Sequence, residues 1–319
     1  VANPNVQTRG VAIIRKGYIV AETYFKGYDK YSSHPSYSVA KSFISALIGI
    51  GLEQGIFKYI EEPVYHYFQE LNRKKGVQVR SSLLQNLPVP GARKRISIEH
   101  LLTMSSGLKW NEQDYFNDSF NDIFLMVDSY DYVQYVLQKP SEYEPGLVWR
   151  YSSGDSMLLS GLFTRALNIS AYEFGQEYLF RPIGIPHIIW HSDPAGHTIG
   201  GWGIEATIRE YAKFGYLYLK KGRWEEQQVV SESWINESLE PVSESIDFYG
   251  YQWWLLPAFE GYEDSIIPKD TCTAWGLFTQ QIFIIPSKQL LIVRMANDPG
   301  SSEWDELEFL TRIVKSLRD

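Results

Sequence analysis

Short β-rich runs lie near both ends of the chain, each pair separated by a turn signal. Residues 10–14 and 18–25 are rich in β-branched and aromatic side chains, and Arg15-Lys16-Gly17 between them is typical of a hairpin. Residues 280–286 and 289–297 flank Pro286-Ser287-Lys288 in the same way. Apolar residues recur every three or four positions in 304–319, which predicts a C-terminal amphipathic helix.

The middle of the chain, from about 55 to 235, has mostly helical periodicity. Its apolar residues follow a helical spacing in five segments, 97–104, 120–138, 156–167, 171–184 and 207–222. We therefore predict an α+β fold, with an antiparallel sheet built from both termini and flanking helices. The predicted organisation is a single domain, 1–319, with a sheet lobe formed by 1–57 and 236–319 and a mostly helical lobe at 58–235.

Composition narrows the class of protein. The 319 residues are 44% hydrophobic, enough to bury a large core, and the formal net charge is −8. Lysine and arginine are scattered apart from clusters at 73–80 and 93–95, which we interpret as solvated loop charge, so nucleic acid is not an expected partner. The single cysteine, Cys272, excludes an internal disulfide and a thiolate metal cluster.

The sequence predicts no transmembrane segment. The longest apolar candidate, 43–52, is shorter than the ~18 residues that a bilayer crossing requires. Because the chain starts without methionine, an exported form with a leader before residue 1 and a cytoplasmic form both stay open. The oligomeric state stays open as well.

Ser38 and Lys41 stand three residues apart at the start of the most apolar helical run. On a helix they share one face, and burial near a helix N-terminus favours a neutral lysine that can take a proton from the serine. The alternative is a cap at Ser38 with Lys41 directed to solvent. A second Ser-x-x-Lys, Ser106 to Lys109, contains Gly107 and has no apolar helix behind it, so we interpret it as a turn.

Other catalytic patterns fit less well. The sequence has no Gly-x-Ser-x-Gly elbow, no His-Glu-x-x-His pair and no glycine-rich phosphate loop. His191, Asp193 and His197 could in principle ligate a metal, but their segment contains proline and glycine and is typical of a loop. We expect neither a metal nor a cofactor.

Five segments, in order, resemble motifs of the serine β-lactamase and penicillin-binding-protein superfamily. The resemblance is to the branch with class C β-lactamases, family VIII esterases and 6-aminohexanoate-dimer hydrolases. The segments are 36–43 (SYSVAKSF), 96–110 (ISIEHLLTMSSGLKW), 144–163 (EPGLVWRYSSGDSMLLSGLF), 199–224 (IGGWGIEATIREYAKFGYLYLKKGRW), and 249–257 followed by 273–293. The resemblance implies a β-lactamase/transpeptidase-like fold and a serine hydrolase that forms an acyl-enzyme.

The resemblance also implies roles for individual residues. Ser38 would be the acylated nucleophile and Lys41 its general base. Tyr151 falls where the family has the tyrosine of Tyr-x-Asn, whose phenol shuttles a proton. Ser153 replaces the asparagine, as in the similar Tyr-x-Ser of 6-aminohexanoate-dimer hydrolase-like members.

The third family motif, Lys-Thr-Gly, corresponds here to Ala274-Trp275-Gly276. The resemblance implies an oxyanion hole made by the backbone amides of Ser38 and Leu277, with Gly276 giving substrate close access to the strand. Ser153, Trp275, Gly276 and Trp110 are the expected substrate-binding residues. Trp110 and the aromatic–acidic stretch 111–124 suggest a pocket wall or lid, with core packing as the alternative.

We therefore expect hydrolysis of a small ester or linear amide. A β-lactamase or D-amino-acid peptidase is an alternative, but Ala274 and Trp275 lack the cation and hydroxyl that hold a substrate carboxylate, unless Lys269 replaces them. A non-catalytic relative that binds ligands or acts as a scaffold is the other alternative. Such a relative would normally have lost part of the Ser38, Lys41 and Tyr151 set, which is intact here.

Overall fold

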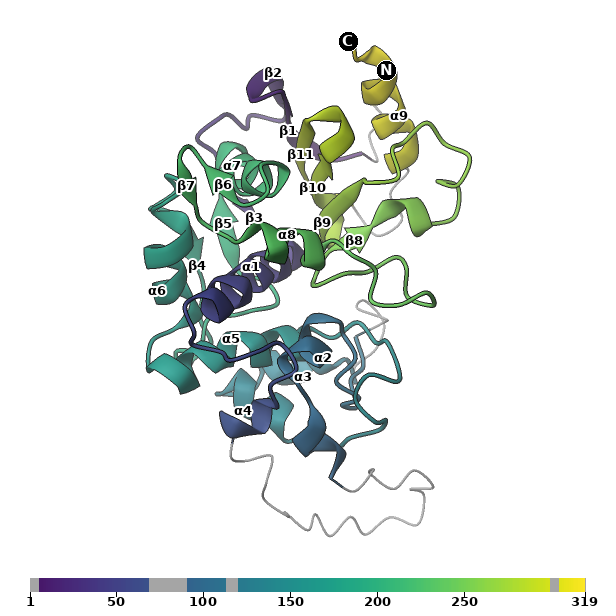
Figure 1. Cartoon of the computed structure of the whole chain (residues 1–319). Helices are drawn as coiled ribbons and strands as arrows, with labels where there is room; N and C mark the ends of the chain where they lie inside the picture. The colour runs from purple at the N-terminus through teal and green to yellow at the C-terminus, as the bar shows by residue number, and fades with distance from the viewer. Residues whose placement is uncertain (1–5, 69–90, 113–119, 299–303, 319) are drawn as a thin grey trace. The chain divides into compact units, whose positions relative to one another are not determined.

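The computed structural model describes residues 6–68, 91–112, 120–298 and 304–318 (Figure 1), so the basic cluster at 73–80 and residues 113–119 of the possible lid lie outside it. The chain divides into two compact units. The first comprises Val1–Ala46, Gln176–Trp190 and Trp202–Asp319, and the second Leu47–Gly175 and His191–Gly201.

The first unit is built on a six-stranded sheet with the order β2-β1-β11-β10-β9-β8. Every neighbouring pair is antiparallel, and β1 lies beside β11, so the two ends of the chain share one sheet as predicted. The strands are β1 (Thr8–Arg15), β2 (Tyr18–Tyr24), β8 (Trp254–Leu255), β9 (Cys272–Gly276), β10 (Gln280–Ile285) and β11 (Leu290–Ala296).

Both predicted hairpins are confirmed. Lys16 and Gly17 join β1 to β2 with φ of 49° and 86°, the left-handed pair that a two-residue hairpin turn requires. Gln289, at φ 46°, ends the turn between β10 and β11.

The two central strands are buried along their whole length because helices cover both faces. On one face Gly215 of α7 (Ile208–Leu219) lies so close to the sheet that an added Cβ would be 2.5 Å from a Leu291 methyl group. On the other face Phe283 packs near Phe309 of α9 (Glu306–Ser316). These contacts place α7 in the first unit, with the sheet. Our prediction instead places all of residues 58–235 in one mostly helical lobe.

Helix α1 (Ala40–Glu53) follows the short 3-10 helix η1 (Tyr37–Val39) and begins in the first unit. Phe43 anchors this start, because its ring stacks on Phe214 of α7 with centroids 3.6 Å apart. The remaining parts of the first unit are small: β3 (His34–Pro35), β4 (Ile189–Trp190), β5 (Ile204–Ala206), β6 (Arg223–Trp224), β7 (Gln227–Gln228), α8 (Glu232–Ser238), the π-helical η5 (Gln176–Phe180), and the 3-10 helices η6 (Leu256–Ala258), η7 (Leu277–Thr279) and η8 (Pro286–Lys288).

The second unit is mainly helical, around α5 (Ser153–Leu167). Small residues let neighbours approach this helix: an added Cβ at Gly161 would lie 2.9 Å from a Val133 methyl group. Phe163 packs between Phe57 and Phe174, with ring centroids 5.4 and 4.8 Å away. The other helices are α2 (Ile98–Leu102), α3 (Asp122–Val127), α4 (Tyr132–Leu137) and α6 (Ala171–Gly175), with 3-10 helices η2 (Val64–His66) and η4 (Ala92–Arg95).

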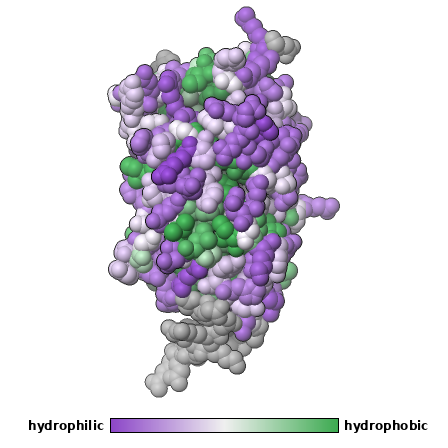
Figure 2. Space-filling view, turned by 60° about the vertical axis from the view of Figure 1, so that its left-hand side comes forward, coloured by the Kyte–Doolittle hydropathy of each residue, from purple (hydrophilic) through white to green (hydrophobic). Residues whose placement is uncertain are grey.

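The surface of the described residues is mostly polar but includes some large hydrophobic side chains, such as those of Tyr31, Phe120 and Leu147. Figure 2 shows a face on which hydrophilic side chains predominate and hydrophobic ones gather in smaller areas. Of the helices that the structure describes, none has the length and hydropathy that a membrane crossing needs.

Candidate active site

Ser38 and Lys41 lie in contact at the junction of η1 and α1. Lys41 Nζ donates to Ser38 Oγ at 3.1 Å, because residues three apart on a helical turn share one face. Lys41 is 2% exposed, whereas Ser38 is partly exposed. A buried amine therefore sits beside an accessible hydroxyl, which excludes the alternative of a lysine directed to solvent.

The segment that carries Ser38 is bound to β5, the middle strand of the three-stranded sheet β3-β5-β4 in the first unit. Ser36 N donates to Ile204 O at 2.8 Å, and Ile204 N donates to Ser36 Oγ at 3.1 Å. Tyr37, directly before Ser38, has φ 45°, an uncommon conformation for a residue with a side chain. The backbone directly before Ser38 is thus fixed to a neighbouring strand, and Tyr37 has a disfavoured conformation.

The end of strand β9 lies against this segment. A Cβ built on Gly276 would be 2.4 Å from Ser36 O and 3.2 Å from Ser38 N, so only glycine lets the two backbones approach this closely. Leu277 follows at the start of η7, and its backbone amide is therefore next to the strand end that faces Ser38 N. The strand end that precedes Leu277 therefore lies against the backbone amide of Ser38.

Trp275 and Ala274, at the other two positions of the third motif, carry no charge. Ala274 is fully buried, whereas Trp275 is partly exposed and packs against Trp254 and Phe259 at 5.9 and 6.3 Å between ring centroids. Lys269 is exposed and donates to Glu263 O at 3.1 Å. The predicted counterpart of the family's cationic lysine is thus the buried Ala274, and an aromatic cluster surrounds the neighbouring Trp275.

The second unit contains Tyr151, Ser153 and Trp110. Within it, Glu112 forms hydrogen bonds with both Ser153 and Trp110. Ser153 N donates to Glu112 Oε2 at 2.7 Å and Ser153 Oγ to Glu112 Oε1 at 3.1 Å, while Trp110 Nε1 donates to the same carboxylate. Tyr151 precedes the N-cap of α5, and its ring centroid is 6.4 Å from that of Trp149.

Glu112 contacts two of the predicted substrate-binding residues, and motif spacing does not identify it. Its local signal is its place two residues after Trp110, and its contact with Ser153 spans 41 positions of sequence. The carboxylate fixes the serine that replaces the family asparagine. Trp110 itself is buried and packs on Gly154, where an added Cβ would be 2.8 Å from the indole ring.

In the second Ser-x-x-Lys, which we interpret as a turn, Gly107 has a left-handed backbone with φ 71°. Ser106 is buried and donates to Asp155 Oδ1 at 2.7 Å, whereas Lys109 is exposed. Burial raises the pKa of Asp155 to about 7, although hydrogen bonds from Ser106 and Ser152 act in the opposite direction.

Asp193, in the loop considered as a possible metal site, has a structural role. Asp193 accepts from His197 N at 2.8 Å and from Tyr132 N at 2.9 Å. In the described part of the chain, no group of three or more histidine, cysteine or acidic residues is arranged to hold a metal ion.

Comparison with known proteins identifies the family. The sequence model of the Beta-lactamase family matches residues 3–314. A 6-aminohexanoate-dimer hydrolase of Paenarthrobacter ureafaciens is 22% identical over 319 residues, covering 94% of this chain and 76% of the relative.

Solved structures show the same fold. The "Putative 6-aminohexanoate-dimer hydrolase" from Bacillus anthracis matches with a TM-score of 0.77 at 20% identity, covering 98% of this chain and 79% of that one. EstCE1, a hydrolase with promiscuous acyltransferase activity, matches with a TM-score of 0.74 at 13% identity, covering 97% and 93%. On the family match across nearly its whole length, the chain belongs to the beta-lactamase family.

Proposed function

We propose that this protein is a serine hydrolase that acts through an acyl-enzyme on a small ester or linear amide. Ser38 is the nucleophile, Lys41 its general base and Tyr151 a proton shuttle. The backbone amides of Ser38 and Leu277 form the oxyanion hole. The observation that carries the proposal is the 3.1 Å contact between a buried Lys41 amine and the accessible Ser38 hydroxyl.

The chemistry follows from these roles. Ser38 Oγ attacks the acyl carbon while its proton passes to Lys41 Nζ, and the two amides stabilise the negative carbonyl oxygen. Collapse of this intermediate breaks the bond to the alcohol or amine, which leaves with a proton delivered through Tyr151. Water then attacks the acyl-enzyme, the same base takes its proton, and the carboxylic acid and free Ser38 are released.

The third motif supports an uncharged substrate. Ala274 and Trp275 offer no charged hydrogen bond to a carboxylate, and such a bond is worth roughly 1.5–3 kcal/mol. The exposed Lys269 donates to a backbone carbonyl. Trp275 and its aromatic neighbours instead favour an extended, largely apolar acyl group. The likeness to a 6-aminohexanoate-dimer hydrolase supports a linear amide as one such substrate.

The test is a comparison of kcat/KM for a p-nitrophenyl short-chain ester, a linear aminohexanoyl amide and a chromogenic cephalosporin in one buffer. We expect the ester or the amide to be hydrolysed at least tenfold more efficiently than the cephalosporin. Intact mass after quenching should show one acyl group, mapped to Ser38. Ser38→Ala should abolish turnover, and Lys41→Arg should lower kcat by about 10²- to 10⁴-fold, since a guanidinium cannot act as the base.

Ser106→Ala is the matched control. It removes the serine of the other Ser-x-x-Lys and should keep wild-type acylation, although Asp155 loses a hydrogen bond and the melting temperature should fall. A label on Ser106 would contradict the assignment of the nucleophile. A cephalosporin hydrolysed faster than both other substrates would favour the β-lactamase alternative, and no adduct with any substrate would favour the non-catalytic one.

A further inference from the structure

The turn η7, which begins with Leu277, has an unusual backbone. Phe278 has φ 58° and ψ 27°, and Thr279 has φ 61°. Two consecutive non-glycine residues are thus left-handed, and the second is β-branched, which makes this conformation particularly unfavourable. Such a turn persists only where surrounding contacts determine it.

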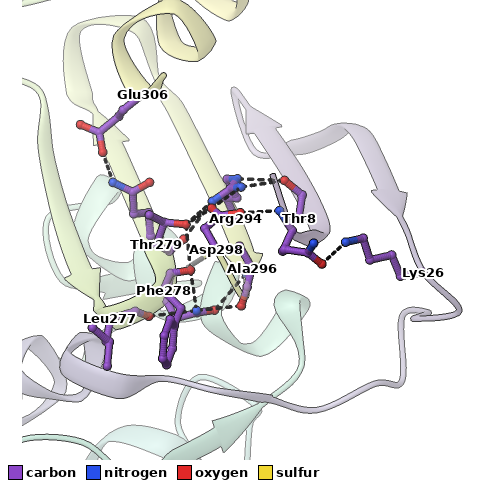
Figure 3. A network of polar contacts seen from close by, with 12 residues as sticks. Thr8, Lys26, Leu277, Phe278, Thr279, Arg294, Ala296, Asp298 and Glu306 are labelled. Carbon is purple, nitrogen blue, oxygen red and sulfur yellow. Dashed lines mark hydrogen bonds and ion pairs between the residues drawn. The ribbon is translucent and has the colours of Figure 1, made fainter. Parts of the chain in front are cut away.

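A buried ion pair on β11 and the segment after it holds Thr279. Arg294 Nη2 and Asp298 Oδ2 are 2.7 Å apart, and both side chains are fully buried. The Thr279 hydroxyl donates to Asp298, and Arg294 Nη1 donates to both the hydroxyl and the carbonyl oxygen of Thr279. Figure 3 shows the arginine between Thr279 and Thr8, whose Oγ1 accepts from Arg294 Nη2 at 2.7 Å.

Gln280 fastens the same turn to β11. Its Nε2 donates to Leu277 O and Phe278 O, both at 3.1 Å, and to Ala296 O at 2.8 Å, while its Oε1 accepts from Ala296 N at 3.0 Å. Figure 3 shows Leu277, Phe278 and Ala296, the residues that these bonds join. The side-chain amide therefore links two carbonyl groups of the turn to the neighbouring strand.

The turn also contacts the segment that carries the proposed nucleophile. The ring of Phe278 packs edge-on against Tyr37, with centroids 5.2 Å apart and planes at 75°. Gly276, directly before the turn, lies against Ser36 O and Ser38 N. The turn and the residue before it thus both border the segment that carries Ser38.

We propose that Thr279, Arg294 and Asp298 are positioning residues that hold this turn so that the Leu277 amide is aimed at the oxyanion. The inference rests on the proposed function, because it concerns an oxyanion formed at Ser38. A buried ion pair is weak evidence for stability, since desolvation opposes the attraction between its charges. The hydrogen bonds between this ion pair and Thr279 instead hold the turn in its left-handed conformation.

A loosened turn should affect the chemical step and substrate binding to different extents. The negative oxygen exists only in the tetrahedral state, so a loosened turn should lower kcat and leave KM nearly unchanged. Loss of a whole oxyanion donor lowers kcat by about 10²- to 10³-fold. A misdirected donor should lower it by about 10- to 100-fold.

The test compares three substitutions of Thr279 with the wild type. Thr279→Val keeps the shape but removes the hydroxyl, and Thr279→Gly removes the hydroxyl and also the unfavourable left-handed side chain. Both should show the kcat loss on a p-nitrophenyl ester and weaker inhibition by phenylboronic acid, which forms a tetrahedral adduct with a nucleophilic serine. Thr279→Ser retains the hydroxyl and should restore both values.

Thr8→Val is the matched control, because it removes the other threonine hydroxyl that accepts from Arg294 without touching the turn. It should lower the melting temperature and keep kcat within about twofold of the wild type. If folded Thr279→Val or Thr279→Gly keeps wild-type kcat and boronic acid inhibition, the inference is wrong. Failure of the proposed function looks different: wild type itself then forms no adduct at Ser38.

Discussion

At the scale of single residues, the site depends on how closely backbones approach. Gly276 has φ −122°, which any residue can adopt, so the need for glycine is steric rather than conformational. Ser36 O occupies the position where a side chain would begin. The same residue therefore fixes the spacing between the Ser38 amide and the turn that starts at Leu277.

Gly276→Ala should separate these two backbones. The carbonyl oxygen 2.4 Å from the new Cβ cannot rotate away like a side chain, so β9 must shift. We expect kcat/KM on an ester substrate to fall about 100-fold or more and the free energy of unfolding to fall by about 1–3 kcal/mol. Gly27→Ala is the control, because nothing lies near an added Cβ but φ 82° disfavours alanine, so it should lower the free energy of unfolding and leave kcat/KM unchanged. Wild-type kcat/KM in Gly276→Ala would show that this close approach is not required.

At the scale of elements, the short helices of the second unit depend on caps. Helices of six residues such as α3 and α4 are far too short to be stable alone. Their first turns are capped by Asn121 and Asp131, and α4 is also bound by Asp193 from the distant loop 191–201. The acid that sequence spacing allowed as a metal ligand therefore joins a helix to a loop.

Asp193→Ala should destabilise the fold without any involvement of metal. It removes the acceptor for Tyr132 N and His197 N, and a buried donor left unsatisfied costs about 1–3 kcal/mol. Thermal unfolding of wild type with and without EDTA is the matched measurement, and we expect identical curves. A melting temperature that falls when EDTA is added to the wild type would restore the metal interpretation.

At the scale of the whole molecule, each unit contains a buried group whose ionisation burial disfavours, His34 in the first and Asp155 in the second. Burial lowers the pKa of His34 to about 4, with a smaller contribution from the nearby Arg9 charge, and neither ring nitrogen has a hydrogen-bond partner. Burial raises the pKa of Asp155 to about 7. Protonation of His34 therefore weakens the first unit in acid, whereas ionisation of Asp155 weakens the second towards neutral pH.

The two groups should act in opposite directions over the same pH range. The unfolded histidine binds a proton near pH 6.5, so the His34 contribution to stability is lost as the pH falls from about 6.5 to 4. The unfolded aspartate ionises near pH 3.9, so the Asp155 contribution is lost as the pH rises from about 4 to 7. Relative to wild type, His34→Leu should make the melting temperature decrease more with rising pH between 4.5 and 6.5. Asp155→Asn should make the melting temperature increase more with rising pH than in wild type. Equal slopes in all three proteins would contradict both assignments.

The sequence by itself determined the features that neighbouring residues create. The two hairpins, the terminal strands, the C-terminal helix and the Ser38–Lys41 pair follow from periodicity, turn residues and a three-residue spacing. Only the tertiary structure decided the rest, because hydrogen bonds such as Ser153 to Glu112 and Gln280 to Ala296 join positions that no local pattern relates. Arg294 is a charged residue within the otherwise apolar strand β11, and this is a local sign of the buried network. Its hydrogen bond to Thr8 exists only because the fold brings Thr8 beside it from 286 positions away.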